Sequence, residues 1–200
     1  MAKSSKPKKG LKPTIWILCE GETEECYFSI IKQNRILWKN IEIIKIWQIS
    51  GKSLNKIKDK IKKVKYTNKE LRVTNSKVFL ILDADAYTPE KINFIKNEIE
   101  NKYVKVLFSN KNFELWILLH LQDCNKENVD YKKLIKKHKN WDKNYEKWEK
   151  NRKFFEKIIK NLKDAIKRAK KLEEIHKNKE NIKYKIPYTE VYKCFEKNLQ

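Results

Sequence analysis

Short apolar runs alternate with amphipathic stretches along the first 121 residues of the chain. Four of these runs have the length and composition of buried strands, and they span Ile15–Cys19, Ile41–Ile49, Val78–Leu82 and Val104–Phe108. The stretches that follow place apolar side chains three or four positions apart, which predicts helices over residues 24–34, 53–66, 89–102 and 113–121. A strand–helix unit repeated four times predicts an α/β fold over residues 14–121, with a mainly parallel four-stranded sheet flanked by helices.

The rest of the chain has a different character. Residues 122–152 are rich in Lys, Asn and aromatic residues without one clean period, whereas residues 153–176 have the clear spacing of one long helix. A last short helix is predicted from Glu190 to about Leu199. We therefore expect residues 122–200 to form a helical extension that packs on the α/β domain, and residues 1–13, which are basic and contain Pro and Gly, to form a disordered arm.

The chain is strongly basic, with 48 Lys and Arg against 26 Asp and Glu and a formal net charge of +22. Such a charge attracts polyanions, nucleic acids above all. Only four of the basic residues are arginines, and the abundance of Lys, Asn and Ile is also typical of an AT-rich genome, so the charge permits nucleic-acid binding without requiring it. Scarce arginine favours phosphate contacts over the reading of guanine edges.

Other features narrow the class of protein. The four cysteines have no C-x-x-C spacing and histidines do not cluster, so we expect neither a zinc site nor a disulfide framework. No segment approaches the roughly 18 apolar residues that span a bilayer, and no signal-like apolar region follows the basic start. We expect a cytoplasmic protein without a membrane segment, and its oligomeric state is left open.

Acidic residues follow two of the predicted strands. Glu20 comes after the first strand and Glu24 one turn later, while Asp83 and Asp85 come after the third. Because the carboxyl ends of parallel strands share one edge of a sheet, we expect these four carboxylates to converge. Like charges at short range raise one another's pKa unless a cation lies between them. Hard oxygen ligands suit Mg²⁺, which indicates metal-assisted phosphoryl chemistry.

The alternative for any acidic residue after a strand is that it caps the next helix. We assign Glu22 and Glu25 to that role, whereas an Asp-x-Asp pair serves capping poorly with its first carboxylate. Glu114 opens the fourth predicted helix and is either a partner of the helix dipole or a further acid of the cluster. His120 lies two turns into an apolar helix and is interpreted as a buried structural residue, and His138 and His176, in polar surroundings, receive no role.

Four segments, in this order, resemble the landmarks of RloB-type proteins, which include AbiL-like phage-resistance components. They are CEGETEECYF, LILDAD, SNKNFELWILLHL and IPYTEVYKCFEKNL, and the resemblance extends from about Thr14 to Leu199. It implies a Toprim-like (Rossmann-like) domain, the fold of topoisomerases, DnaG-type primases and OLD-family nucleases. The family's Ser-Asn-Pro-x-Phe-Glu segment occurs here with Lys111 in place of proline, which leaves the turn geometry open and retains Glu114.

In Toprim domains a glutamate after the first strand and an Asp-x-Asp after the third bind Mg²⁺, which Mn²⁺ can replace. By motif these residues are Glu20, Asp83 and Asp85, with Glu24 where a second acid stands. The resemblance therefore implies a Mg²⁺-dependent nuclease for RNA or DNA in antiphage defence. Glu114 is an additional catalytic candidate if it is an acid of the cluster and not only a partner of the helix dipole. It also implies a separately encoded ATPase partner of the RloA/AbiL type. The alternatives are a non-hydrolytic nucleic-acid- or nucleotide-binding regulator and a toxin-like interaction protein.

Contacts to nucleic acid are expected from lysines and from residues at the sheet edge. Lysines on the second predicted helix face either a phosphate backbone or solvent. An aromatic set at 141, 145 and 148, interleaved with lysines, either stacks bases or forms a packing stripe. The predicted contact residues are Lys52, Lys56, Asn110, Lys111, Trp141 and Lys143.

Overall fold

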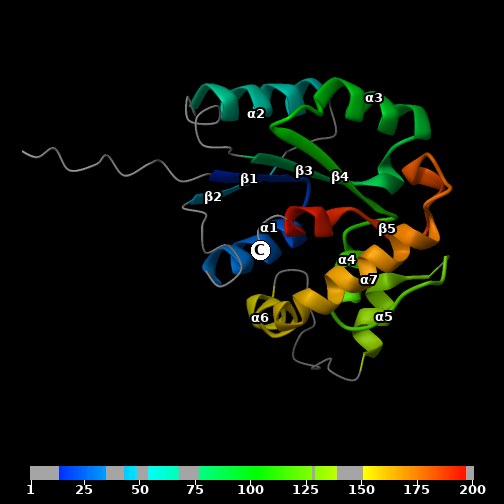
Figure 1. Ribbon diagram of the computed structural model, residues 1–200. Coiled ribbons are helices and arrows are strands. Elements are labelled where there is room, and N and C mark those ends of the chain that lie inside the picture. Colours follow the sequence, from blue (N-terminus) through cyan, green and yellow to red (C-terminus); the bar gives the residue numbers. More distant parts are fainter. Residues whose placement is uncertain are drawn as a thin grey trace, which may run out of the picture.

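The computed structural model describes residues 14–34, 43–48, 54–67, 77–127, 129–138 and 151–196, and its centre is one sheet (Figure 1). The sheet has the strand order β2-β1-β3-β4-β5. Its strands are β1 (Thr14–Cys19), β2 (Ile43–Gln48), β3 (Lys77–Asp83), β4 (Val104–Asn110) and β5 (Tyr188–Thr189). The first four are parallel, which confirms the predicted α/β fold. The short β5 pairs antiparallel with β4 and adds a fifth strand that the sequence analysis did not predict.

The register of the sheet brings the predicted acidic turns to one edge. Cys19, the last residue of β1, pairs with Ile81 of β3, and Asp83 at the end of β3 pairs with Ser109 of β4. Glu20 and Asp83 therefore leave the sheet at the same edge and at nearly the same height.

Helices cover both faces of the sheet (Figure 1). One face carries α2 (Leu54–Thr67) and α3 (Pro89–Ile99), and the other carries α1 (Glu22–Gln33) and α4 (Glu114–Leu119). Strand alternation divides the core accordingly, because Trp16 and Leu18 pack with the first pair of helices, whereas Ile15 and Ile17 pack with the second. These helices confirm the predicted ones to within about three residues at each end.

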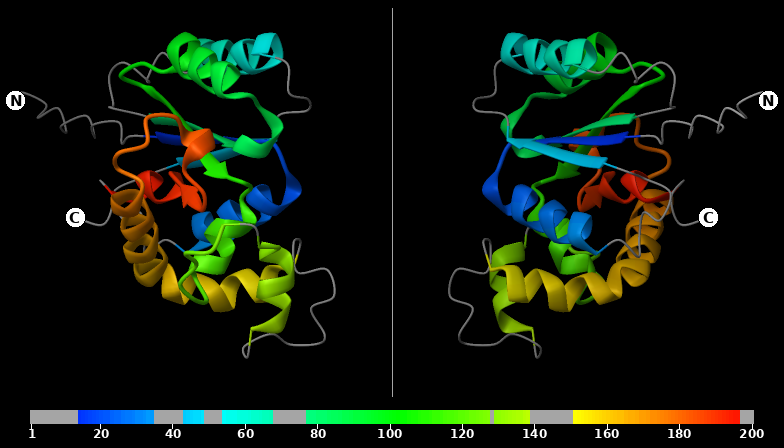
Figure 2. Two further views of the ribbon diagram at one scale, coloured as in Figure 1. Left: turned by 90° about the vertical axis from the view of Figure 1, so that its right-hand side faces the viewer. Right: turned by 90° about the vertical axis from the view of Figure 1, so that its left-hand side faces the viewer.

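The C-terminal half adds helices to the α1 and α4 side of the sheet (Figure 2). They are α5 (Tyr131–Lys137), α6 (Arg152–Ile158) and α7 (Leu162–Ile175). The single helix predicted over 153–176 is wrong, since a 3₁₀ turn, η4 (Ile159–Asn161), separates α6 from α7. At this turn the Asn161 side chain donates a hydrogen bond to the carbonyl of His120 (3.0 Å), which links the turn to the end of α4.

The last part of the chain returns to the sheet. It contains the 3₁₀ turn η5 (Ile182–Tyr184), then β5, then a second turn, η6 (Val191–Cys194). The helix predicted from Glu190 is thus a short 3₁₀ turn in the described residues, with bonds from the amide of Lys193 to the Glu190 carbonyl and from the amide of Phe195 to the Tyr192 carbonyl.

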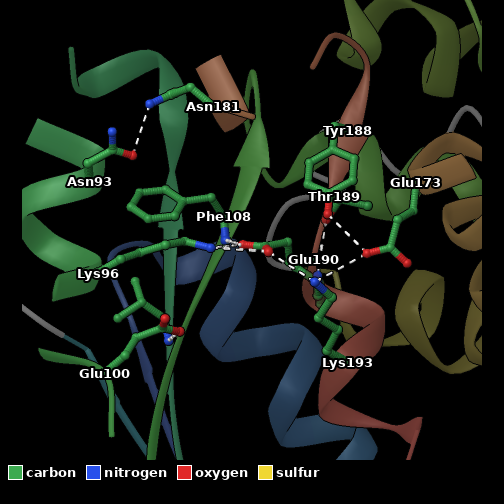
Figure 3. A network of polar contacts seen from close by, with 12 residues as sticks. Asn93, Lys96, Glu100, Phe108, Glu173, Asn181, Tyr188, Thr189, Glu190 and Lys193 are labelled. Carbon is green, nitrogen blue, oxygen red and sulfur yellow. Dashed lines mark hydrogen bonds and ion pairs between the residues drawn. The ribbon is translucent and has the colours of Figure 1, made fainter. Parts of the chain in front are cut away.

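A buried carboxylate fixes this returning segment to the sheet (Figure 3). Glu190 is 5% exposed and accepts hydrogen bonds from the Phe108 amide (3.2 Å) and from the ammonium groups of Lys96 and Lys193 (both 3.0 Å). The C-terminal segment is thereby tied to β4 and α3. No helix in the described ranges is long and apolar enough to cross a membrane.

Candidate carboxylate site

The turn after β1 contributes two carboxylates. Glu20 follows the strand and is half-buried, while Glu24 lies in the first turn of α1 and is buried. Gly21 stands between them because a Cβ there would lie 2.5 Å from Glu24 Oε2. Burial, the Glu114 charge and the Glu20 charge together raise the pKa of Glu24 to about 7, against backbone hydrogen bonds that lower it. Glu24 therefore changes protonation near neutral pH.

The end of β3 contributes the Asp-x-Asp pair. Asp83 is the last residue of the strand, and its Oδ1 accepts a 2.9 Å hydrogen bond from the Phe113 amide, while Asp85 is exposed in the 3₁₀ turn η2 (Ala84–Ala86). Burial raises the pKa of Asp83 to about 8, and four carboxylates add to the shift. In decreasing order of effect these are Glu24, Glu114, Asp85 and Glu20. The five acidic residues singled out in the sequence are therefore within electrostatic range of one another.

Glu114 joins the cluster from α4. It is buried at the start of the helix, and its carboxylate forms a 3.1 Å ion pair with the ammonium of Lys132 on α5. Its charge contributes to the raised pKa values of both Glu24 and Asp83. Glu114 thus lies in the first turn of α4 and also within electrostatic range of Glu24 and Asp83, so both interpretations remain open.

Sequence reasoning missed Tyr87, which lies two residues after Asp85. Its hydroxyl donates a 2.7 Å hydrogen bond to Glu20 Oε1, and its buried ring packs edge-on against Phe108, with centroids 6.1 Å apart. Burial, the hydrogen bond to Glu20 and the charges of Glu20 and Asp83 raise the pKa of the phenol above its usual range. Only its closeness to the Asp-x-Asp pair could have suggested this role from sequence.

Asn110 has a different function from the predicted contact with nucleic acid. Its side chain is 2% exposed, and its amide nitrogen donates to the carbonyls of Ile182 (2.8 Å), Lys183 (3.0 Å) and Lys185 (2.9 Å). An amide occupied in this way is not free to bind phosphate. Asn110 instead anchors the η5 segment next to the end of β4.

Lys183 is a second residue that sequence reasoning missed. Its ammonium donates to the carbonyl of Ala84 (2.9 Å) and to that of Asp85 (3.3 Å). A lysine from the C-terminal part of the chain therefore lies against the turn that carries the Asp-x-Asp pair. No local sequence pattern indicates this contact, because it joins positions 98 and 99 residues apart.

The remaining predicted contact residues are scattered. Lys56 is exposed on α2, and Lys111 is half-buried with its carbonyl accepting from the Asp85 amide (3.2 Å), after a cis peptide bond from Asn110. Lys52, Trp141 and Lys143 lie outside the described residues.

Two of the histidines are buried. His120 is confirmed as a buried structural residue: its ring bonds the Tyr27 hydroxyl (3.0 Å) and the Trp116 carbonyl (2.9 Å), and burial lowers its pKa to about 4. His176 is 5% exposed and lies within electrostatic range of Glu127, Lys179 and Lys185, so its surroundings are polar although it is buried.

The side chains of the carboxylate site are of the kind that binds a divalent cation, but they are not arranged around one point in the described residues. Its donors are hard carboxylate oxygens, and the pKa values of Glu24 and Asp83 are raised by burial first and by the neighbouring carboxylates next, of which a cation would offset the second. Within the described ranges, however, no three acidic, His or Cys side chains are already gathered as a metal site.

Comparison with known protein families identifies the family to which this chain belongs. A family model described as RloB-like protein matches residues 15–197. The chain belongs to the RloB-like family. The match confirms the resemblance seen in the four motifs, and in this RloB-like protein it covers the whole carboxylate site, Tyr87 and Lys183. No curated protein matched the chain, and no solved structure matched it.

Proposed function

We propose that this RloB-like protein is a Mg²⁺-dependent nuclease of the Toprim type that hydrolyses phosphodiester bonds in RNA or DNA. The observation that carries the proposal is the placement of five carboxyl groups at the carboxyl edge of a parallel sheet, close enough for the others to act on Glu24 and Asp83. Two of them, Glu24 and Asp83, have pKa values raised to about 7 and about 8, by burial first and by the other acids next. A divalent cation is the partner that makes such a cluster favourable in its ionised form.

Glu20, Asp83 and Asp85 are the proposed ligands, with Glu24 as a further one. Bound Mg²⁺ would polarise the scissile phosphate and make water a stronger nucleophile at neutral pH. The protein's own contribution is orientation: Tyr87 holds the Glu20 carboxylate, and the Phe113 amide holds that of Asp83.

Proton movement is assigned to the same residues. Glu20 takes the proton of the attacking water, and Glu24, with a pKa near 7, exchanges protons at neutral pH. Glu114 keeps its ion pair with Lys132, and its negative charge favours the binding of a cation at the site. No step needs a residue from outside the cluster.

The biological setting is proposed from family membership. An RloB-like protein suggests a role in antiphage defence, and the sequence has no G-x-x-x-x-G-K-[ST] motif of its own, so we propose a separately encoded ATPase partner. The net charge of +22 supports nucleic acid as the substrate.

The test compares wild type with Asp83→Asn on tRNA, single-stranded DNA and plasmid, in Mg²⁺, in Mn²⁺ and in EDTA. Asparagine keeps the acceptor for the Phe113 amide and removes the charge. The matched control is Asp164→Asn, which removes an exposed charge in the first turn of α7. We expect metal-dependent cleavage that Asp83→Asn abolishes while binding persists and Asp164→Asn leaves cleavage unchanged. Cleavage that survives in Asp83→Asn excludes this site, and tight binding without cleavage by the wild type favours the non-hydrolytic regulator.

A further inference from the structure

The 3₁₀ turn η5 presents three consecutive side chains in three directions. With three residues per turn, neighbouring side chains point about a third of a turn apart. Ile182 is buried in the core beneath α3, Lys183 reaches the carbonyls of η2, and Tyr184 is 61% exposed. The turn therefore places one cation against the Asp-x-Asp turn and presents one exposed aromatic ring on the residue that follows it.

The backbone of this turn is held from both sides. Asn110 donates to three of its carbonyls, as described above, and Asn181 donates to the Pro89 carbonyl (3.1 Å) and to Asn93 Oδ1 (3.0 Å), a contact visible in Figure 3. Asn181 also accepts from the Lys183 amide (2.8 Å). Because the backbone is fixed before a ligand arrives, binding costs less conformational entropy than it would on a free loop.

The Lys183 ammonium is suited to a phosphate. An ammonium has three N–H groups, and two of them go to the carbonyls of Ala84 and Asp85. Those bonds hold the positive charge of Lys183 next to the Asp-x-Asp turn and leave one N–H group of the ammonium to donate to an anion. A single cation in such a place balances the carboxylates and draws in a phosphate that the acidic cluster alone would repel.

Tyr184 is suited to an unpaired base. An exposed ring next to lysines stacks nucleobases and tolerates any sequence, since every base has a π-face. A second exposed ring, Phe94, directly follows Asn93 on α3, the residue to which Asn181 is bonded, and the Lys91 ammonium lies 5.0 Å from its centroid. Aromatic rings and cations therefore occur together on the α3 and η5 side of the site.

We propose that η5 is the substrate-binding element for single-stranded nucleic acid, with Lys183 on a backbone phosphate and Tyr184 stacked on an adjacent base. A duplex is disfavoured because its bases are already stacked on one another and are not open to a side-chain ring. The inference rests on the proposed function, since it takes the carboxylate cluster as the reaction centre. It adds the class of substrate and the residues that select it.

The experiment measures binding alone, so it does not depend on cleavage. Fluorescence anisotropy follows labelled oligothymidylate and oligouridylate in EDTA over a series of salt concentrations. The variants are Lys183→Gln, Tyr184→Ala and Tyr184→Phe, and the matched control is Lys185→Gln. Lys185 lies in the same segment and carries the same charge, but its ammonium lies over the Tyr188 ring, 5.1 Å from the centroid.

For Lys183→Gln we expect the slope of log K against log[salt] to become shallower by about 0.7, the value for one phosphate contact on a single strand. Tyr184→Ala should weaken binding about tenfold, and Tyr184→Phe, which keeps the ring, should bind as the wild type does. Lys185→Gln should change the slope less than Lys183→Gln does. A duplex of the same sequence should bind more weakly and be insensitive to Tyr184→Ala.

Two outcomes overturn the inference: no single-strand binding by the wild type, or equal slopes for the two lysine variants together with normal binding by Tyr184→Ala. Either can occur while metal-dependent cleavage persists, in which case the proposed function stands without this element. If binding follows the expected pattern but no cleavage occurs, η5 is supported as a contact for single strands and the proposed nuclease activity is contradicted.

Discussion

Tyr87 and Glu20 are 67 positions apart in the chain and meet through a 2.7 Å hydrogen bond from the phenol hydroxyl to Glu20 Oε1. The Tyr87 ring is buried and is packed against Phe108, so the hydroxyl has little freedom to move. The bond selects one orientation of the Glu20 carboxylate at the edge of the sheet where Asp83 also ends. If Glu20 binds a metal ion as proposed, Tyr87 would be a second-sphere donor that orients this ligand.

Tyr87→Phe tests this orientation. The substitution removes the hydroxyl and keeps the ring, so we expect Mn²⁺ affinity, measured by electron paramagnetic resonance, to fall by about 10- to 100-fold. The free energy of unfolding should change by only about 1 kcal/mol, the net value of one hydrogen bond. The control is Tyr103→Phe, which should leave Mn²⁺ affinity unchanged. Tyr103 is half-buried and directly precedes β4, at the end of the strand away from the carboxylate site. Equal Mn²⁺ affinities for wild type and Tyr87→Phe would show that the hydroxyl does not position a ligand.

The raised pKa values predict an unusual dependence of stability on pH. Burial, followed by the neighbouring acids, raises the pKa of Asp83 from its ordinary 3.8 to about 8 and that of Glu24 from 4.5 to about 7. Between about pH 4 and pH 8 the folded state therefore binds more protons than the unfolded state, and the free energy of unfolding falls as the pH rises through this window.

Asp83→Asn should remove the larger part of that dependence. Asparagine cannot ionise, so the variant's stability relative to wild type should grow by on the order of 2 kcal/mol from pH 5 to pH 8 in metal-free buffer. Urea unfolding at each pH measures the difference, and the exposed Asp164→Asn provides the baseline. Millimolar Mg²⁺ at pH 8 should shrink the difference by stabilising the wild type. A difference that is constant with pH would mean that Asp83 ionises normally.

The elements that sequence predicts well are those fixed by local periodicity. Continuous apolar runs such as Val78–Leu82 are typical of strands buried on both faces, and their alternation with helices predicted the parallel sheet and the edge at which Glu20 and Asp83 both lie. The convergence of the acidic residues followed from that topology. It needed no knowledge of side-chain contacts.

The elements that sequence missed are fixed by contacts between distant residues. The two-residue strand β5 is too short to give a pattern and exists because Thr189 and Tyr188 pair with the end of β4. At the break between α6 and α7 the Asn161 side chain bonds to the His120 carbonyl, and next to Lys183 the Asn110 side chain bonds to the backbone. In these two cases a polar side chain bonds to backbone far away in sequence, which periodicity cannot indicate.

Asn110→Ala should release the η5 segment. It removes the donor that holds three carbonyls and leaves a space in a buried site, so we expect a loss of about 2 to 3 kcal/mol in the free energy of unfolding. Hydrogen exchange of the amides of Lys183 and Lys185 should accelerate more than that of β1. Asn93→Ala, which removes one exposed acceptor on α3, is the control and should cost well under 1 kcal/mol. If η5 exchanges at the wild-type rate in Asn110→Ala, other contacts hold the segment.

Glu190→Ala tests how the end of the chain is held against the sheet. The carboxylate joins the Phe108 amide to Lys96 and Lys193 (Figure 3), and although burial alone would lower the pKa of Lys193, the Glu190 charge helps to hold it above its usual range. Removing Glu190 leaves the buried Phe108 amide and the Lys96 ammonium without this acceptor, while Lys193 keeps its 3.3 Å ion pair with Glu173, so we expect a cost of about 3 kcal/mol. In a chain of this size such a loss lowers Tm by roughly 10 °C.

Glu190→Gln separates the effect of charge from that of packing at this position, and Glu174→Ala is a surface control. Glu190→Gln keeps an acceptor for the Phe108 amide and should be less destabilised than Glu190→Ala in the same thermal scan. Glu174→Ala removes an exposed carboxylate that pairs with Lys177 on the surface, and should change stability by less than about 1 kcal/mol. If Glu190→Ala were as mild as Glu174→Ala, the buried network would contribute no more than a surface pair, and packing of Tyr192 and Phe195 alone would have to hold the returning segment.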